Sequence, residues 1–140
     1  IVVVLVILFI KKCCFSRKEI IVALLSGVLA WVLALIVKDL IPSSVRPFKL
    51  NGFPPLTITI PADSSFPSGH TALSFGIASY LWLINRKYGF LFILLAAFVG
   101  IGSILSLVHY PIDVIGGLIL GIFSALLIDF LQTRKGNFIK

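Results

Sequence analysis

Long apolar runs alternate with short polar segments along this chain. The runs cover residues 20–37, 71–84, 89–108 and 114–131. Each approaches the length that a helix needs to cross about 30 Å of hydrocarbon, the second being short unless its polar flanks are included. The pattern therefore predicts an all-α fold, a polytopic bundle with four full transmembrane spans.

The first ten residues form a fifth apolar run, which leads directly into Lys11 and Lys12. A signal peptide carries its basic residues before its apolar run, so we expect this stretch to be the end of a truncated span. The chain shows no second soluble domain or low-complexity tract. We therefore expect one membrane-embedded domain over residues 1–140, incomplete at its N-terminus.

Composition supports a membrane protein, because 59% of the residues are hydrophobic and only 12% are charged. A chain of this size has too little polar surface to cover a water-soluble globule. The net charge of +7 could suggest nucleic acid, but the basic residues form short clusters between apolar runs. We therefore expect a bilayer, and no nucleic acid, as the partner.

The basic clusters also predict topology. All but three of the twelve Lys and Arg residues flank span ends that fall on one side, and Lys38, Arg46 and Lys49 fall on the other. By the positive-inside rule the larger group is cytoplasmic, together with the C-terminus. The loop 38–68 and His109 then share the outer face, which predicts one site built from two distant segments.

The loop 38–68 is rich in proline, which predicts an ordered extramembrane segment without long helices. It ends in Ser68, a good N-cap, and Gly69, which lets the backbone approach a ligand. The apolar run from Thr71 then predicts a helix whose N-terminus faces the loop and suits a phosphate. The alternative is a plain capped helix with His70 at the membrane interface.

The second polar segment holds His109 and, four residues on, Asp113. Pro111 fits the first turn of a helix, which places Asp113 in that turn. A carboxylate there can accept from one ring nitrogen of His109 and leave the other free as a nucleophile or base. Alternatively it only complements the helix dipole.

Two basic residues complete the candidate site. Arg46 offers a planar fork for phosphate oxygens, whereas Lys38 could be only a snorkelling anchor. Phosphoryl transfer through one histidine, with the second as acid, needs no metal or other cofactor. The five acidic residues form no cluster that would hold a metal.

These motifs resemble the type 2 phosphatidic acid phosphatase family: Lys38 with Arg46-Pro47, Pro67-Ser68-Gly69-His70, and His109 with Asp113. They look most like bacterial members that dephosphorylate undecaprenyl diphosphate. The resemblance implies a bundle of about six spans, of which this chain holds the last five. It also implies that His109 attacks phosphorus, Asp113 orients it and His70 protonates the leaving group. By the same resemblance, the phosphate is held by Lys38, Arg46, Ser68 and Gly69.

The chain departs from the family pattern at two places. The family carries Ser-Arg where this chain has Gly102-Ser103, so one phosphate-binding arginine is absent. The family's first motif has a lysine at a fixed distance before its arginine, here Arg46. If Lys38 is that lysine, the distance is one residue longer than usual, and the usual distance would place Asp39 at the lysine position. We expect Lys38 to take the role, because Asp39 would repel phosphate.

We therefore expect an integral membrane phosphatase for a lipid phosphate or diphosphate, at the outer face of a bacterial inner membrane. The alternative is a lipid-phosphate-binding or assembly protein with impaired catalysis, marked by Ser103. A vanadate-dependent haloperoxidase shares the anion-site motifs but is soluble, so the apolar runs count against it.

Overall fold

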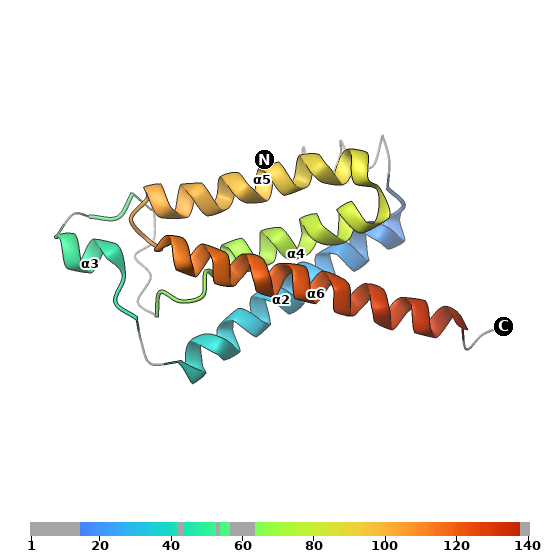
Figure 1. Ribbon diagram of the computed structural model, residues 1–140, viewed down its shortest axis with the longest axis horizontal. Helices are drawn as coiled ribbons and strands as arrows, with labels where there is room; N and C mark the ends of the chain where they lie inside the picture. The colour runs from blue at the N-terminus through green and yellow to red at the C-terminus, as the bar shows by residue number, and fades with distance from the viewer. Residues whose placement is uncertain (1–14, 42–43, 53, 57–63, 138–140) are drawn as a thin grey trace.

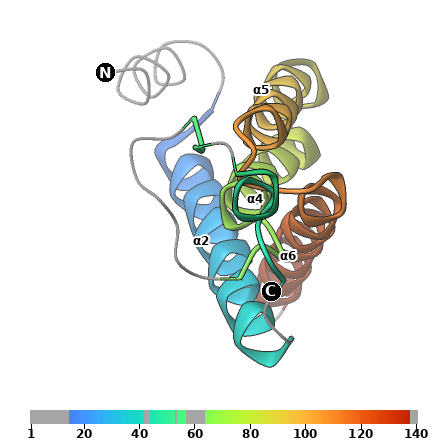
Figure 2. The same cartoon turned by 90° about the vertical axis from the view of Figure 1, so that its left-hand side faces the viewer.

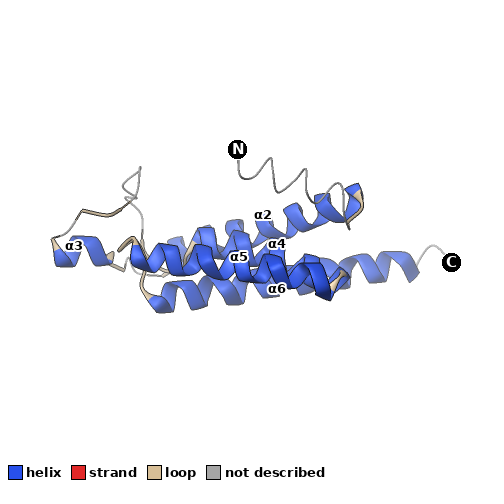
Figure 3. Cartoon of the chain, turned by 90° about the horizontal axis from the view of Figure 1, so that it is seen from above, coloured by secondary structure: helices blue, strands red, loops and turns tan. Residues whose placement is uncertain are grey.

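The computed structural model describes residues 15–41, 44–52, 54–56 and 64–137, and these residues form five helices and no strand (Figure 3). The apolar run 1–10 lies outside the described residues. The all-α prediction is confirmed. The helices are α2 (Arg17–Leu40), α3 (Pro47–Asn51), α4 (Gly69–Ile84), α5 (Arg86–Leu105) and α6 (Pro111–Asn137).

Each of the four apolar runs becomes a helix, but the helices differ in length. In the described part of the chain, three segments are long and apolar enough to cross a membrane: Arg17–Leu40, Arg86–Leu105 and Pro111–Arg134. The remaining apolar run, 71–84, forms α4. This helix has only 16 residues, because Ser68 caps its start and the chain turns at Asn85. The predicted count of four full spans is therefore not confirmed, whereas the apolar helices fit an integral membrane protein.

Helix α4 lies at the centre of the bundle, with α2, α5 and α6 around it (Figure 2). Its neighbours approach closely because the contact residues are small. A Cβ added to Gly76 would lie 2.9 Å from the Cα of Gly27 on α2, and one added to Gly121 on α6 would lie 2.8 Å from the Gly76 nitrogen. Small residues at such contacts are typical of helices that pack within a membrane.

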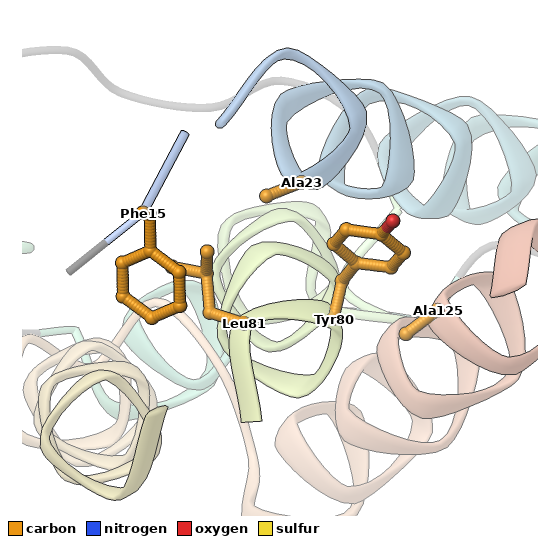
Figure 4. Close-up of a cluster of buried hydrophobic side chains, with 5 residues drawn as sticks. All are labelled: Phe15, Ala23, Tyr80, Leu81 and Ala125. Atoms are coloured by element: carbon orange, nitrogen blue, oxygen red, sulfur yellow. The ribbon is translucent and has the colours of Figure 1, made fainter. Parts of the chain in front are cut away.

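The outer surface of the bundle is apolar. Ile21 on α2, Phe98 on α5 and Phe123 on α6 are all more than half exposed. At the end of the bundle far from α3, Phe15, Tyr80 and Leu81 are buried together with Ala23 and Ala125 (Figure 4). Large apolar side chains therefore face the surroundings along the spans, while the buried centre combines glycine and alanine contacts with the large α4 side chains Phe75, Tyr80 and Leu81.

One end of the bundle gathers the polar segments. Helices α4 and α6 begin there, α5 ends there, and the short helix α3 lies beyond them (Figure 1). Pro47 begins α3 with its fixed backbone angle, and Gly52 ends α3 with φ of 70°, which glycine adopts without strain. The described parts of the loop 38–68 and the His109 segment thus meet at one end, as the sequence predicted.

Candidate active site

Backbone hydrogen bonds join the two distant motifs. The Ser68 N–H donates to the Asp113 carbonyl at 2.9 Å, so the first turns of α4 and α6 are held together. The Phe48 N–H of α3 donates to the Leu107 carbonyl at 3.1 Å. Leu107 has φ of 59°, which turns the chain from α5 towards His109. A leucine rarely adopts this left-handed region, and such residues are enriched at functional sites.

His109 and Asp113 form the centre of the site, and both side chains are buried. His109 Nδ1 lies 3.3 Å from Asp113 Oδ2, and His109 Nε2 lies 3.5 Å from Arg46 Nη1. A guanidinium can only donate, so Nε2 must present its lone pair towards it. The arrangement therefore favours the neutral tautomer with hydrogen on Nδ1 and an unprotonated Nε2 that faces Arg46.

Asp113 lies in the first turn of α6, as predicted. Its Oδ2 atom accepts from the Tyr110 N–H at 2.8 Å and from the Ser65 hydroxyl at 2.5 Å, in addition to its contact with His109. The Tyr110 bond caps the helix, so the carboxylate does serve the helix start. The carboxylate therefore both contacts His109 and lies at the positive end of the α6 dipole, so the two alternatives are not exclusive here.

Arg46 is also buried, with 2% of its surface exposed. Its Nη1 donates to the Val108 carbonyl at 3.0 Å, and its Nη2 donates to the Ser64 carbonyl at 3.1 Å. These bonds fix the fork between the loop before α4 and the residue that precedes His109. A buried cation positioned in this way favours negative charge at the Nε2 side of the imidazole.

Lys38, near the end of α2, reaches the same loop. Its Nζ donates to the Ser64 carbonyl at 2.8 Å, the carbonyl that also accepts from Arg46. The neighbouring Asp39 side chain is exposed. Lys38 rather than Asp39 therefore faces the site segments, despite the longer spacing to Arg46.

The start of α4 has the predicted form. Ser68 is its N-cap, and its buried hydroxyl oxygen accepts from the Thr71 N–H at 3.4 Å and from the Thr71 hydroxyl at 2.9 Å. Gly69 packs under the Trp31 ring, where an added Cβ would lie 3.2 Å from Trp31 Cδ1. His70 is exposed on the first turn. The roles predicted for these residues remain predictions.

Ser103 contributes its backbone to the site rather than a cation. Its carbonyl accepts from the Val108 and His109 N–H groups, both at 3.2 Å, while its hydroxyl donates to the Val99 carbonyl at 2.9 Å. In the described residues no three His, Cys, Asp or Glu side chains are grouped as metal ligands. The residues that meet here are instead suited to hold an anion directly.

Ser65 was not among the predicted site residues, although its side chain is completely buried against Asp113. No sequence signal could have found this contact, because it depends on how the loop before α4 folds back onto α6. Taken together, a carboxylate-supported histidine, two cations and a capped helix start lie at one end of an apolar bundle. This arrangement suits a membrane protein that handles a phosphate group.

The chain belongs to the PAP2 superfamily, whose family model matches residues 3–135. This match confirms the resemblance inferred from the motifs. Over 135 residues the chain is 38% identical to the bacitracin transport permease protein BcrC of Bacillus licheniformis, covering 96% of this chain and 66% of that protein. Over 125 residues it is 31% identical to the undecaprenyl-diphosphatase BcrC of Bacillus subtilis strain 168, covering 89% and 62%.

A third relative is the lipid A 1-phosphatase of Rhizobium johnstonii, 30% identical over 115 residues, with 82% of this chain and 47% of that protein covered. The chain spans just under two thirds of the length of the two BcrC proteins. The family and these relatives support a phosphatase.

Proposed function

We propose that this protein is a membrane phosphatase that removes a phosphate from a lipid phosphate or diphosphate, with undecaprenyl diphosphate as the first candidate substrate. The observation that carries the proposal is His109, held between the Asp113 carboxylate and the Arg46 guanidinium with its Nε2 lone pair on the Arg46 side. The substrate class follows from the relatives, one of which is named for undecaprenyl diphosphate and another for lipid A.

In the first step, His109 Nε2 attacks the terminal phosphorus. A P–N bond forms while the bond from phosphorus to the bridging oxygen breaks, and protonated His70 gives its proton to the departing oxygen. Asp113 accepts from Nδ1–H and stabilises the positive charge that develops on the ring. Arg46, Lys38 and the N–H groups at the start of α4 stabilise the charge on the phosphoryl oxygens.

In the second step, water attacks the phosphohistidine. The neutral His70 takes a proton from that water, the P–N bond breaks, and inorganic phosphate leaves. The net reaction consumes one water and leaves a lipid with one phosphate fewer. Side chains and backbone N–H groups of the protein stabilise the charges that develop in these two steps, so the proposed mechanism calls for no metal.

The proposed orientation places the site on the outer face of a bacterial inner membrane and the C-terminus in the cytoplasm. The distribution of Lys and Arg along the sequence supports it, because only Lys38, Arg46 and Lys49 lie in the polar segments that also carry the site residues, while the other nine lie beside the opposite ends of the apolar runs. A lipid substrate would then offer its phosphate from the outer leaflet with its tail still in the bilayer.

The test is phosphate release from undecaprenyl diphosphate and from phosphatidate, by purified protein in detergent with EDTA present. We expect release by the wild type and none by His109→Ala. Release that continues in the variant would refute the histidine mechanism. If the folded wild-type protein released no phosphate from either lipid, the proposed phosphatase activity would be refuted.

One observation favours a second candidate, a lipid-phosphate-binding protein with impaired catalysis. Ser103 stands where the family has an arginine, and loss of one such donor costs about 10²- to 10³-fold in rate. If the protein is an enzyme, Ser103→Arg should raise kcat. Gly102→Arg is the matched control, because it adds the same charge one position away, where an added Cβ meets open space. A pure binder would retain lipid phosphate and gain no turnover from either variant.

A further inference from the structure

Ser65 makes a contact that its loop does not need for its own structure. The Ser65 N–H donates to the Ser44 carbonyl at 3.1 Å, and the next N–H, that of Phe66, donates to the Ser44 hydroxyl at 2.9 Å. The backbone on both sides of the Ser65 side chain is therefore already fixed. The hydroxyl is directed elsewhere, onto Asp113 Oδ2 at 2.5 Å.

This contact changes how firmly the carboxylate is held. Without Ser65, Oδ2 would accept only from the Tyr110 N–H of its own helix start and from His109. Both of those donors lie within four residues of Asp113, so neither holds the carboxylate to a distant segment of the chain. Ser65 approaches from a segment 48 residues away. It therefore ties the carboxylate to an independent part of the fold.

The same loop also holds the backbone of Asp113, whose carbonyl accepts from the Ser68 N–H. The segment from Ser65 to Ser68 thus fixes both the side chain and the main chain of Asp113. Ser65 Oγ lies 3.5 Å from His109 Nδ1 as well, so the hydroxyl, the carboxylate and the imidazole form one compact group. All three side chains are at least 96% buried, so solvent does not substitute for any of these bonds.

We propose that Ser65 is a positioning residue: its hydroxyl holds Asp113 Oδ2 where that oxygen fixes the His109 tautomer with Nε2 free. The inference rests on the proposed function, in which His109 is the nucleophile. Ser65 itself touches neither the reacting nitrogen nor the phosphate. Its effect is on the rate of the chemical step rather than on binding.

The kinetic test compares Ser65→Ala and Ser65→Cys with wild type. Loss of a hydrogen bond to a charged group should lower kcat about 10-fold in both variants, with KM within about 2-fold. Cysteine fills the space but donates weakly, so a packing role would leave Ser65→Cys near wild type and impair only Ser65→Ala. That result, or a wild-type kcat in Ser65→Ala, would overturn the inference.

Ser26→Ala is the matched control. Ser26 is equally buried, and its hydroxyl donates to the Gly76 carbonyl at 2.9 Å, seven residues along α4 from Gly69. This variant should lose thermal stability while its kcat stays at the wild-type value. An equal fall of kcat in Ser26→Ala and Ser65→Ala would mean that general loosening explains both, and the positioning role would be wrong.

A second measurement does not require turnover, so it separates failure of this inference from failure of the proposed function. The chain has two histidines, so NMR of protein labelled with ¹⁵N-histidine reports on His70 and His109 alone. We expect the His109 Nδ1–H signal to move in Ser65→Ala and stay in place in Ser26→Ala. An unmoved signal would overturn the inference even if the wild type were inactive.

Discussion

Replacing Asp113 by Asn tests the tautomer argument most directly. The change removes the negative charge beside His109 but keeps the side-chain shape. Its outcome depends on which end of the new amide faces His109. An amide oxygen there would still accept from Nδ1–H, whereas an NH₂ group would force the other tautomer and place hydrogen on the attacking Nε2.

The structure decides between these orientations. The Tyr110 N–H, at 2.8 Å from Oδ2, can only donate, and the Ser65 hydroxyl also donates to that atom. Both donors therefore hold the amide oxygen in the Oδ2 position, so the His109 tautomer should be kept. What is lost is the charge: a hydrogen bond to a charged group contributes about 1.5–3 kcal/mol and a neutral one about 0.5–1.5, a difference of about 1–1.5 kcal/mol. That difference corresponds to a fall in kcat of about 5- to 13-fold.

The assay is kcat for phosphate release from undecaprenyl diphosphate under saturating lipid. Asp129→Asn is the control, because it makes the same substitution further along α6. It should leave kcat unchanged. A fall of about 10⁴-fold in Asp113→Asn is the value expected for the wrong tautomer, and would refute the orientation argument. An unchanged kcat would show that the carboxylate charge has no part in catalysis.

Three further predictions concern the cations and the packing. Arg46→Lys should lower kcat about 10²-fold or more, because an ammonium group cannot bind both carbonyls that the guanidinium binds. A kcat within about threefold of wild type would contradict this prediction. Lys38→Met should lower kcat/KM whereas Asp39→Asn should not, and the reverse result would assign the motif position to residue 39. Gly76→Ala should destabilise the protein by about 1–3 kcal/mol in thermal unfolding, because the added Cβ would meet the α2 backbone. Gly102→Ala is the control and should not destabilise the protein, because its Cβ meets open space. Equal unfolding temperatures for the two variants would refute the packing account.

The sequence predicted the helices well because long apolar runs have few other solutions in a membrane. It also predicted the contact between His109 and Asp113, since Pro111 favours a helix start that places Asp113 in the first turn, four residues after His109. At Gly116, Gly117 and Gly121 on α6, an added Cβ would lie 2.5–2.6 Å from an atom of a neighbouring segment, so these small residues allow close packing. The apolar runs and the spacing between His109 and Asp113 are local properties of the chain, so the sequence alone is enough to predict them.

Contacts between distant segments were not predictable in the same way. The shared Ser64 carbonyl, which accepts from Lys38 and Arg46, depends on the path of the loop before α4. The Ser65 contact with Asp113 depends on the same path. The spacing between Lys38 and Arg46 likewise says little, because the reach of a lysine side chain absorbs one extra residue.

The shortness of α4 sets the depth of the site. Its far end turns at Asn85 beside Arg86 and Lys87, which are exposed and belong at a membrane surface. Sixteen residues rise about 24 Å, whereas the hydrocarbon is about 30 Å thick. With α4 upright and that end at the interface, Gly69 stands roughly 6 Å beneath the opposite plane. Under the proposed function, the phosphate of the substrate must pass below the headgroup plane to reach the start of α4. A lipid substrate is already anchored in the bilayer by its tail, so its phosphate can reach this depth. A water-soluble phosphate ester would have to lose its hydration to reach the same depth.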